Sequence, residues 1–231
     1  FMVKFEGPTL QDVYGKFEEN WKLSGGGALR PVTLDLAPKG DRTLQVAVTS
    51  TSEREIRDSY LAAFKAAKDH IFINSPYFID SDMVASLKDA AKRGVKVTAI
   101  VPSVGDNPAI DLMNRSVVNE LLATGVKVYE YDTLNEDIGQ HDHETDHFNH
   151  GKVATIDGKF TIIGTANMDR RSMALSQEIN LNVDSEAFAK DVEERIFQHD
   201  LLTRAKPAQV STMSAPTKAA EKILNAFRPL F

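Results

Sequence analysis

The sequence predicts an α/β fold, with a mostly parallel β-sheet flanked by helices on both faces. Apolar segments with strand-like and helix-like spacing alternate along most of the 231 residues. This alternation is typical of a parallel sheet that is covered by its crossover helices. The string Gly-Val-Lys-Val occurs twice, at residues 94–97 and 125–128, each time after a helical pattern and before a strand. The spacing is about that of one strand–helix unit.

The expected elements follow one another from residue 43 to residue 205. Ser81 is expected to cap a helix that Gly94 ends, and Asn107 with Pro108 opens another helix that Gly125 ends. Asp157 with Gly158 indicates a tight hairpin turn. Strands are expected at 43–48, 70–74, 95–101, 126–131, 152–156, 160–163 and 178–183, and helices at 53–68, 81–93, 107–124 and 186–202.

The two ends of the chain differ from this central region. Residues 2–5 suggest a strand, and a helix with Pro8 in its first turn follows and ends at the glycines 25–27. Residues 206–216 are linker-like, and residues 217–227 suggest a short amphipathic helix. We therefore expect three parts: 1–42, a strand, helix and linker; 43–205, the main domain; and 206–231, a linker with a terminal helix. Because the chain starts inside a strand-like pattern, we expect a fragment of a longer protein.

Composition limits the classes of function. The chain has no cysteine, which excludes disulfides, thiolate metal sites and a cysteine nucleophile. Its formal net charge is −6, which argues mildly against nucleic acid as a partner. No apolar stretch approaches the length needed to span a bilayer, and the first residues lack the pattern of a signal peptide.

The chemistry is concentrated in the segment HGKVATIDGKFTIIGTAN. His150, Lys152 and Asp157 stand as H-x-K-x4-D, and Thr165 and Asn167 follow in Gly-Thr-Ala-Asn. Two residues apart on a strand, His150 and Lys152 share a face. Lys152 and Asn167 suit the non-bridging oxygens of a phosphodiester, while His150 suits attack on phosphorus or protonation of a leaving alkoxide. Asp157 is expected to brace the motif rather than to touch substrate.

These motifs resemble the signature of the phospholipase D superfamily, H-x-K-x4-D followed by G-[ST]-x-N. Residues 75–78 (SPYF) resemble an element of bacterial cardiolipin synthases, and residues 167–172 resemble their N-x-D-x-R-S. Residues 5–8 (FEGP) through Trp21 resemble the stretch that closes the first catalytic half of those enzymes. The last five residues, FRPLF, resemble their C-terminal end.

The resemblance implies a site in which two such motifs meet. One histidine becomes phosphorylated and the other serves as acid and then base, without a metal or another cofactor. By resemblance to a second half, His150 would be the acid and base, and Glu178 would orient the histidine of the opposite half. Tyr77, Thr165 and Ser172 are further candidates for substrate binding. Tyr77 could equally pack in the interior. Ser172 lies beside an arginine that could form a structural ion pair.

The chain contains a single H-x-K string, so a complete site needs a partner. That partner is either an N-terminal half with its own motif or a second copy of the chain. The favoured interpretation is a cardiolipin synthase-like phosphatidyltransferase that acts on phospholipids. Alternatives are a phospholipase D-type hydrolase, a single-motif homodimeric nuclease, and an inactive half with a role in assembly.

Two segments have competing interpretations. The loop with His141, His143 and His147 offers ligands for a divalent cation, but its spacing fits no standard zinc pattern, so a solvated acidic loop is favoured and no metal is predicted. The terminal helix could contact a membrane surface or pack on protein. The resemblance implies a bacterial protein located peripherally at a membrane.

Overall fold

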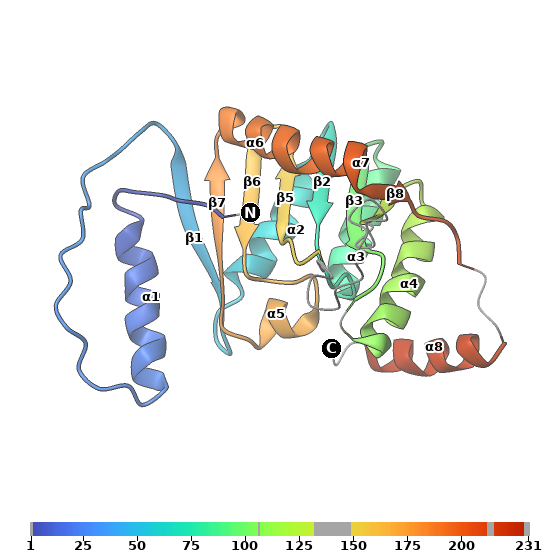
Figure 1. The fold of residues 1–231 in the computed structure, drawn as a ribbon, viewed down its shortest axis with the longest axis horizontal. Helices are drawn as coiled ribbons and strands as arrows, with labels where there is room; N and C mark the ends of the chain where they lie inside the picture. Colours follow the sequence, from blue (N-terminus) through green and yellow to red (C-terminus); the bar gives the residue numbers. More distant parts are fainter. Residues whose placement is uncertain (1, 106, 132–148, 212–214, 229–231) are drawn as a thin grey trace, which may run out of the picture.

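A single mixed sheet organises the molecule (Figure 1). The computed structural model describes residues 2–105, 107–131, 149–211 and 215–228, and within them eight strands lie in the order β1-β7-β6-β5-β2-β3-β4-β8. The strands are β1 (Thr43–Thr49), β2 (His70–Asn74), β3 (Lys96–Pro102), β4 (Lys127–Tyr131), β5 (Val153–Ile156), β6 (Phe160–Gly164), β7 (Glu178–Asp184) and β8 (Ala205–Pro207). The helices are α1 (Leu10–Leu23), α2 (Glu55–Ala66), α3 (Ser81–Lys92), α4 (Pro108–Leu122), α5 (Arg170–Ala174), α6 (Glu186–Val192), the π-helix η2 (Glu193–Gln198), α7 (His199–Thr203) and α8 (Ala215–Phe227).

The α/β class is confirmed, but the expected majority of parallel pairs is corrected. Only the pairs β2–β3 and β3–β4 are parallel in the described residues, and the other neighbours in the sheet are antiparallel. The connections explain the difference, because α3 and α4 cross over between the parallel strands, whereas a three-residue turn, Asp157 to Lys159, reverses the chain between β5 and β6. Asp157 and Gly158 have positive φ, 54° and 62°.

Most expected elements between residues 43 and 205 are confirmed within a few residues. The helix N-cap is Asp80 rather than Ser81, because the Asp80 carboxylate accepts hydrogen bonds from the backbone N–H groups of Asp82 and Met83. The sequence did not predict α5 or β8, which are very short. Residues 2–5 do not form a strand.

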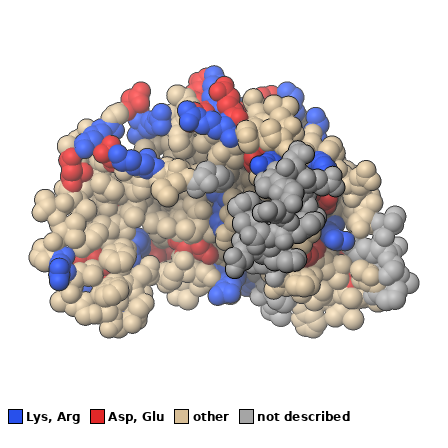
Figure 2. Space-filling view, viewed as in Figure 1, with Lys and Arg blue, Asp and Glu red and all other residues tan. Residues whose placement is uncertain are grey.

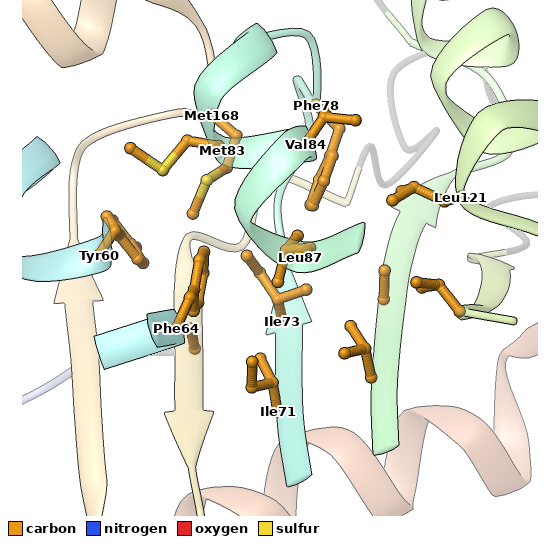
Figure 3. Packing of buried hydrophobic residues seen from close by; sticks show 14 of the residues in the cluster. Tyr60, Phe64, Ile71, Ile73, Phe78, Met83, Val84, Leu87, Leu121 and Met168 are labelled. Atoms are coloured by element: carbon orange, nitrogen blue, oxygen red, sulfur yellow. The ribbon is translucent and has the colours of Figure 1, made fainter. Parts of the chain in front are cut away.

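Each face of the sheet carries its own hydrophobic core. Helices α2, α3 and α4 cover one face, where Phe64, Ile73 and Leu87 pack together (Figure 3). The continuous helical stretch α6–η2–α7 covers part of the other face and runs across one end of the strands in Figure 1. There the ring of Phe197 stacks on Phe72, with centroids 5.3 Å apart. The prediction of helices on both faces of the sheet is therefore confirmed, and the sheet is packed between two hydrophobic cores.

The terminal helices lie at opposite sides of the molecule (Figure 1). No residue of α1 is buried, and an ion pair of 2.7 Å joins Lys16 to Glu53. Helix α8 contacts α4, and the buried Arg228 donates a hydrogen bond of 2.6 Å to the carbonyl of Ile79. The C-terminal segment is thus anchored to the main domain more firmly than α1.

We expect Phe197→Ala to lower the free energy of unfolding by about 3–5 kcal/mol, because the side chain is fully buried between η2 and the sheet. Urea unfolding followed by circular dichroism measures the change. The control is Leu202→Ala, since Leu202 is 85% exposed and its loss should cost less than about 0.5 kcal/mol. Equal losses in the two variants would contradict the described packing of η2.

Candidate active site

Strand register brings the motif segments to one end of the sheet. Asn74, the last residue of β2, pairs with Val153 at the start of β5. Val153 pairs in turn with Ile163 near the end of β6, and Gly164 pairs with Asn180 near the start of β7. The His-x-Lys segment before β5, the Gly-Thr-Ala-Asn turn after β6 and the beginning of β7 therefore lie together.

His150 and Lys152 line one cavity at this end, with a volume of about 490 Å³. Lys152 is only 9% exposed, and its ammonium donates a hydrogen bond of 2.9 Å to the carbonyl of His150. Asn74 and Gly164 line the same cavity. An imidazole beside a largely buried ammonium can bind a phosphate oxygen and move a proton at the same place.

Glu178, the first residue of β7, lies at the centre of a hydroxyl cluster at the same end of the sheet. One carboxylate oxygen accepts a hydrogen bond of 2.5 Å from Thr165, and the other accepts one of 2.9 Å from Ser172. The Thr165 hydroxyl also accepts from the backbone N–H of Ile179 at 3.0 Å. A carboxylate held in this way keeps lone pairs that can accept a further donor.

Asn167 is half-buried and forms a side-chain hydrogen bond with Asp169. Asp169 caps α5 by accepting a hydrogen bond of 2.7 Å from the backbone N–H of Ser172. Burial raises the pKa of Asp169 above its usual value, although the hydrogen bonds from Ser172 and Asn167 oppose this change. The buried carbonyl oxygen of Asn167 has no hydrogen-bond partner in the described structure. Asn167 thus links the turn after β6 to α5.

The Ser-Pro-Tyr-Phe segment packs against the turn after β6. Phe78 is fully buried in the core, whereas Tyr77 is half-buried. The carbonyl of Tyr77 accepts a hydrogen bond of 3.0 Å from the N–H of Met168. The side chain of Asn114 accepts a hydrogen bond of 2.8 Å from the N–H of Phe78. Sequence patterns did not identify Asn114, because a buried asparagine on a helix has no local signal.

Asp157 lies at the opposite end of the sheet from His150. Its carboxylate accepts hydrogen bonds from the backbone N–H groups of Lys68, Asp69 and His70, at 3.0, 2.8 and 3.0 Å. Burial alone would raise the pKa of Asp157, but these N–H donors hold it below its usual value. Asp157 therefore connects the β5–β6 hairpin to the beginning of β2.

His70 is part of a second titratable group at that opposite end. Its ring nitrogens lie 2.8 Å from Asp69 and 3.0 Å from Glu193, the first residue of η2. Burial lowers the pKa of His70, but the two carboxylates together raise it above the usual value. His199, by contrast, is exposed. Neither histidine lines the cavity.

A second, more apolar hollow of about 300 Å³ adjoins the first, and Gly164 lines both. Ile163, Ile179 and Leu181 contribute to its wall together with Thr165. A side chain at position 164 would meet the carbonyl of Ile179, with an added Cβ only 2.3 Å from its oxygen. The loop with His141, His143 and His147, and the closing Pro-Leu-Phe, lie outside the described residues.

Comparison with known proteins identifies the family. Residues 60–201 match the family described as "Cardiolipin synthase, PLD-like domain", so the chain belongs to this family of the phospholipase D superfamily. It is 28% identical over 242 residues to cardiolipin synthase A of Edwardsiella ictaluri, across 99% of this chain and 46% of that protein. It is also 28% identical over 240 residues to cardiolipin synthase A of Klebsiella pneumoniae, across 99% and 46%. The chain thus spans about half the length of these curated relatives.

Solved structures show the same fold. Nuc, a phospholipase D family member from Salmonella typhimurium, matches with a TM-score of 0.59 and 18% identity. The match covers 73% of this chain and 99% of the Nuc chain. NucT from Helicobacter pylori has a TM-score of 0.59 and 20% identity, and covers 71% and 98%. Phosphatidylserine synthase of Haemophilus influenzae has a TM-score of 0.62 and 15% identity, and covers 95% and 53%.

We expect Asp157→Asn to reduce the free energy of unfolding by about 1.5–3 kcal/mol at pH 7, because an amide cannot accept from all of the surrounding N–H groups. The folded-state pKa of Asp157 is lowered, so its contribution is present above its ordinary pKa of 3.8 and is lost as the pH falls through the folded-state value.

Thermal and urea unfolding between pH 7 and pH 3 tests this expectation. The difference between the wild type and Asp157→Asn should shrink below about pH 4. Asp89→Asn provides a control, since that carboxylate is 64% exposed and forms only a surface ion pair with Lys92, so its loss should change stability little. A difference independent of pH would show that the Asp157 charge does not act as described.

Proposed function

We propose that this chain supplies one half of a phosphatidyl-transfer site and acts on phospholipids as cardiolipin synthase does. The observation that carries the proposal is that His150 and Lys152 line one cavity, in a chain that belongs to the cardiolipin synthase domain family. Thr165, Ser172 and Glu178 form a hydrogen-bonded cluster at the same end of the sheet.

The reaction would pass through a phosphohistidine on a second motif. The histidine of that motif attacks phosphorus of the donor lipid, and the bond between phosphorus and the leaving alcohol oxygen breaks while His150 protonates that oxygen. His150 then removes the proton of an acceptor alcohol, whose oxygen attacks phosphorus and breaks the phosphorus–nitrogen bond. Lys152 and Asn167 would hold the non-bridging oxygens, and Glu178 would orient the opposite histidine.

The second motif would come from an N-terminal half of the same polypeptide or from a second copy of the chain. Relatives about twice as long support the first arrangement, and the single H-x-K string of the chain is compatible with the second. Tyr77, Thr165 and Ser172 are proposed to help position substrate. Because Ser172 is 3% exposed, it would act through Glu178.

A peripheral position at a membrane fits a lipid substrate. No helix in the described part of the chain is long and apolar enough to cross a bilayer. On α8, Ile223 is 61% exposed and Phe227 is 52% exposed, and the neighbouring Lys222 is also exposed. Such a helix surface suits contact with an anionic lipid surface, although packing on another half would also cover it.

Hydrolysis is the main alternative, because water can replace the acceptor alcohol at the same residues. A single-motif homodimeric nuclease is a second alternative, and the likeness to Nuc and NucT shows that it would need no other fold. The net charge of −6 weighs against nucleic acid, and Figure 2 shows acidic and basic side chains interspersed along its upper edge rather than a basic stripe. The remaining alternative is not an enzyme: the chain would be an inactive half whose role is to assemble with a partner.

We expect His150→Ala in the natural gene product to lower phosphatidyl transfer at least about 10²-fold, because a general acid and base is removed. The assay measures cardiolipin formed from phosphatidylglycerol by thin-layer chromatography, and phosphatidic acid reports hydrolysis. Lys190→Ala, on the exposed side of α6, is the control and should retain activity. Wild-type protein that makes neither product would overturn the proposal, and full activity in His150→Ala would overturn the role of His150.

We expect the chain alone to be inactive as a monomer and to gain activity when an N-terminal half with its own His-x-Lys motif is added, since neither half holds both histidines. Light scattering gives the oligomeric state, and the same lipid assay gives the activity. An active monomer would contradict a shared site. An active dimer of the chain alone would replace the two-half arrangement with the homodimer.

A further inference from the structure

The cavity that His150 and Lys152 line also has polar residues from outside the motif. They are Asn74 from the end of β2, Asn149 before β5 and Asp200 from α7, and the part of the cavity that they line is called the recess. None of these three residues belongs to the H-x-K-x4-D or Gly-Thr-Ala-Asn strings. They come from three separate elements, so their meeting is a consequence of the tertiary fold.

Asn74 is the most unusual member of this recess. It is 1% exposed, and neither the nitrogen nor the oxygen of its amide has a hydrogen-bond partner in the described structure. A Cβ atom added to Gly151 would lie 3.0 Å from the Asn74 nitrogen, so the backbone of the His-Gly-Lys segment lies close against this amide. Buried polar groups are nearly always paired, and an unpaired amide beside a reactive centre suggests that a ligand completes it.

Asn149 adds a second unpaired donor. Its side-chain oxygen accepts a hydrogen bond of 3.3 Å from the N–H of Gly151, but its buried side-chain nitrogen has no partner in the described structure. Asn74 and Asn149 therefore each bring an unpaired amide donor to the cavity that Lys152 also lines.

Asp200 supplies an acceptor to the same cavity. Its side chain is 16% exposed, and one carboxylate oxygen lies 3.3 Å from Nδ1 of the exposed His199, so its other oxygen is the acceptor offered to a ligand. Asp200 also lies near Tyr131, whose pKa is raised by burial and then by the charge of Asp200. Arg195 also lines the cavity, but its side chain is 78% exposed and forms an ion pair of 2.5 Å with Asp191. Arg195 therefore lies at the rim, and Asp200 remains the acidic group of the recess.

We propose that Asn74, Asn149 and Asp200 form a subsite that binds the hydroxyl groups of a polyol esterified to the phosphate, as in the head group of a phospholipid. This inference rests on the proposed function, because it places the phosphate at Lys152 and the attached alcohol in the recess. A hydroxyl both donates and accepts, so it can satisfy an amide and a carboxylate at once. An ammonium head group only donates and leaves the amide donors unpaired, and an alkyl group satisfies neither.

Equilibrium binding to the chain tests the subsite without requiring turnover. The probes are ethyl phosphate, glycerol 1-phosphate and phosphoethanolamine, titrated by ligand-observed NMR. We expect glycerol 1-phosphate to bind about tenfold more tightly than either other probe, because its hydroxyls pair with buried groups. Equal binding of ethyl phosphate and glycerol 1-phosphate would overturn the subsite.

Asn74→Leu and Asp200→Asn locate the effect. Asn74→Leu should remove most of the preference for glycerol 1-phosphate, leave ethyl phosphate binding unchanged, and keep or raise the melting temperature, because it removes unpaired buried atoms. Asp200→Asn should also reduce the preference for glycerol 1-phosphate, because it removes the charge of the carboxylate while the side chain keeps nearly the same shape. The matched control is Asn225→Leu on α8. The side-chain oxygen of Asn225 is also buried and unpaired in the described structure, but its nitrogen donates to Ser116 and the residue does not line the cavity. An unchanged preference in both recess variants would overturn the assignment.

Two further arms separate the subsite from the proposed function and identify the source of the polyol. Lys152→Met should weaken ethyl phosphate binding, whereas Lys190→Met should not. If Lys152→Met leaves ethyl phosphate binding unchanged, the proposed phosphate site is wrong. If Lys152→Met weakens that binding but the wild type binds ethyl phosphate and glycerol 1-phosphate equally, only the subsite is contradicted. Dihexanoyl phosphatidylglycerol should displace glycerol 1-phosphate. Failure to displace it would overturn the lipid head group in favour of a soluble polyol phosphate.

Discussion

The carboxylate of Asp157 ties the β5–β6 hairpin to the beginning of β2, and the arrangement of the candidate site depends on this contact. Its hydrogen bonds to the N–H groups of Lys68, Asp69 and His70 are formed where Ile156 and Ile71 pair. The register fixed there continues along the strands to the other end, where Asn74 pairs with Val153. A shift of one residue would turn every side chain of β5 to the other face. Asp157 thus positions the His-x-Lys segment from the far end of the sheet.

The two ends of the sheet have different physical characters. At the end with Asp157, that carboxylate accepts hydrogen bonds from three backbone N–H groups, and His70 lies between two carboxylates. The hydroxyls of Thr155 and Thr161 on the same hairpin are buried without a partner in the described structure. At the end with His150, the amides of Asn74, Asn149 and Asn167 keep unpaired buried atoms in the described structure. Unpaired polar groups cost stability, and folded proteins retain them where a ligand or a partner completes them.

Local sequence patterns predicted most of the secondary structure because the signals are local. The positive-φ glycines 94 and 125 end helices as expected, and Asp157 with Gly158 forms the expected hairpin turn. The parallel majority was wrong because strand direction depends on which strands become neighbours. The chain alternates strand and helix, yet β5, β6 and β7 return as an antiparallel group beside β2.

The sequence by itself determined the family and the motif residues His150, Lys152 and Asn167, because a motif is a spacing of side chains along neighbouring residues, here directly before β5 and directly after β6. Only the tertiary structure decided that Asp157 lies away from the site, that Thr165 and Ser172 both hold Glu178, and that Asn74 and Asp200 share a cavity with His150. Strand β2 and helix α7 are 125 residues apart, from Asn74 to His199, and no local pattern encodes which distant residues the sheet order brings together.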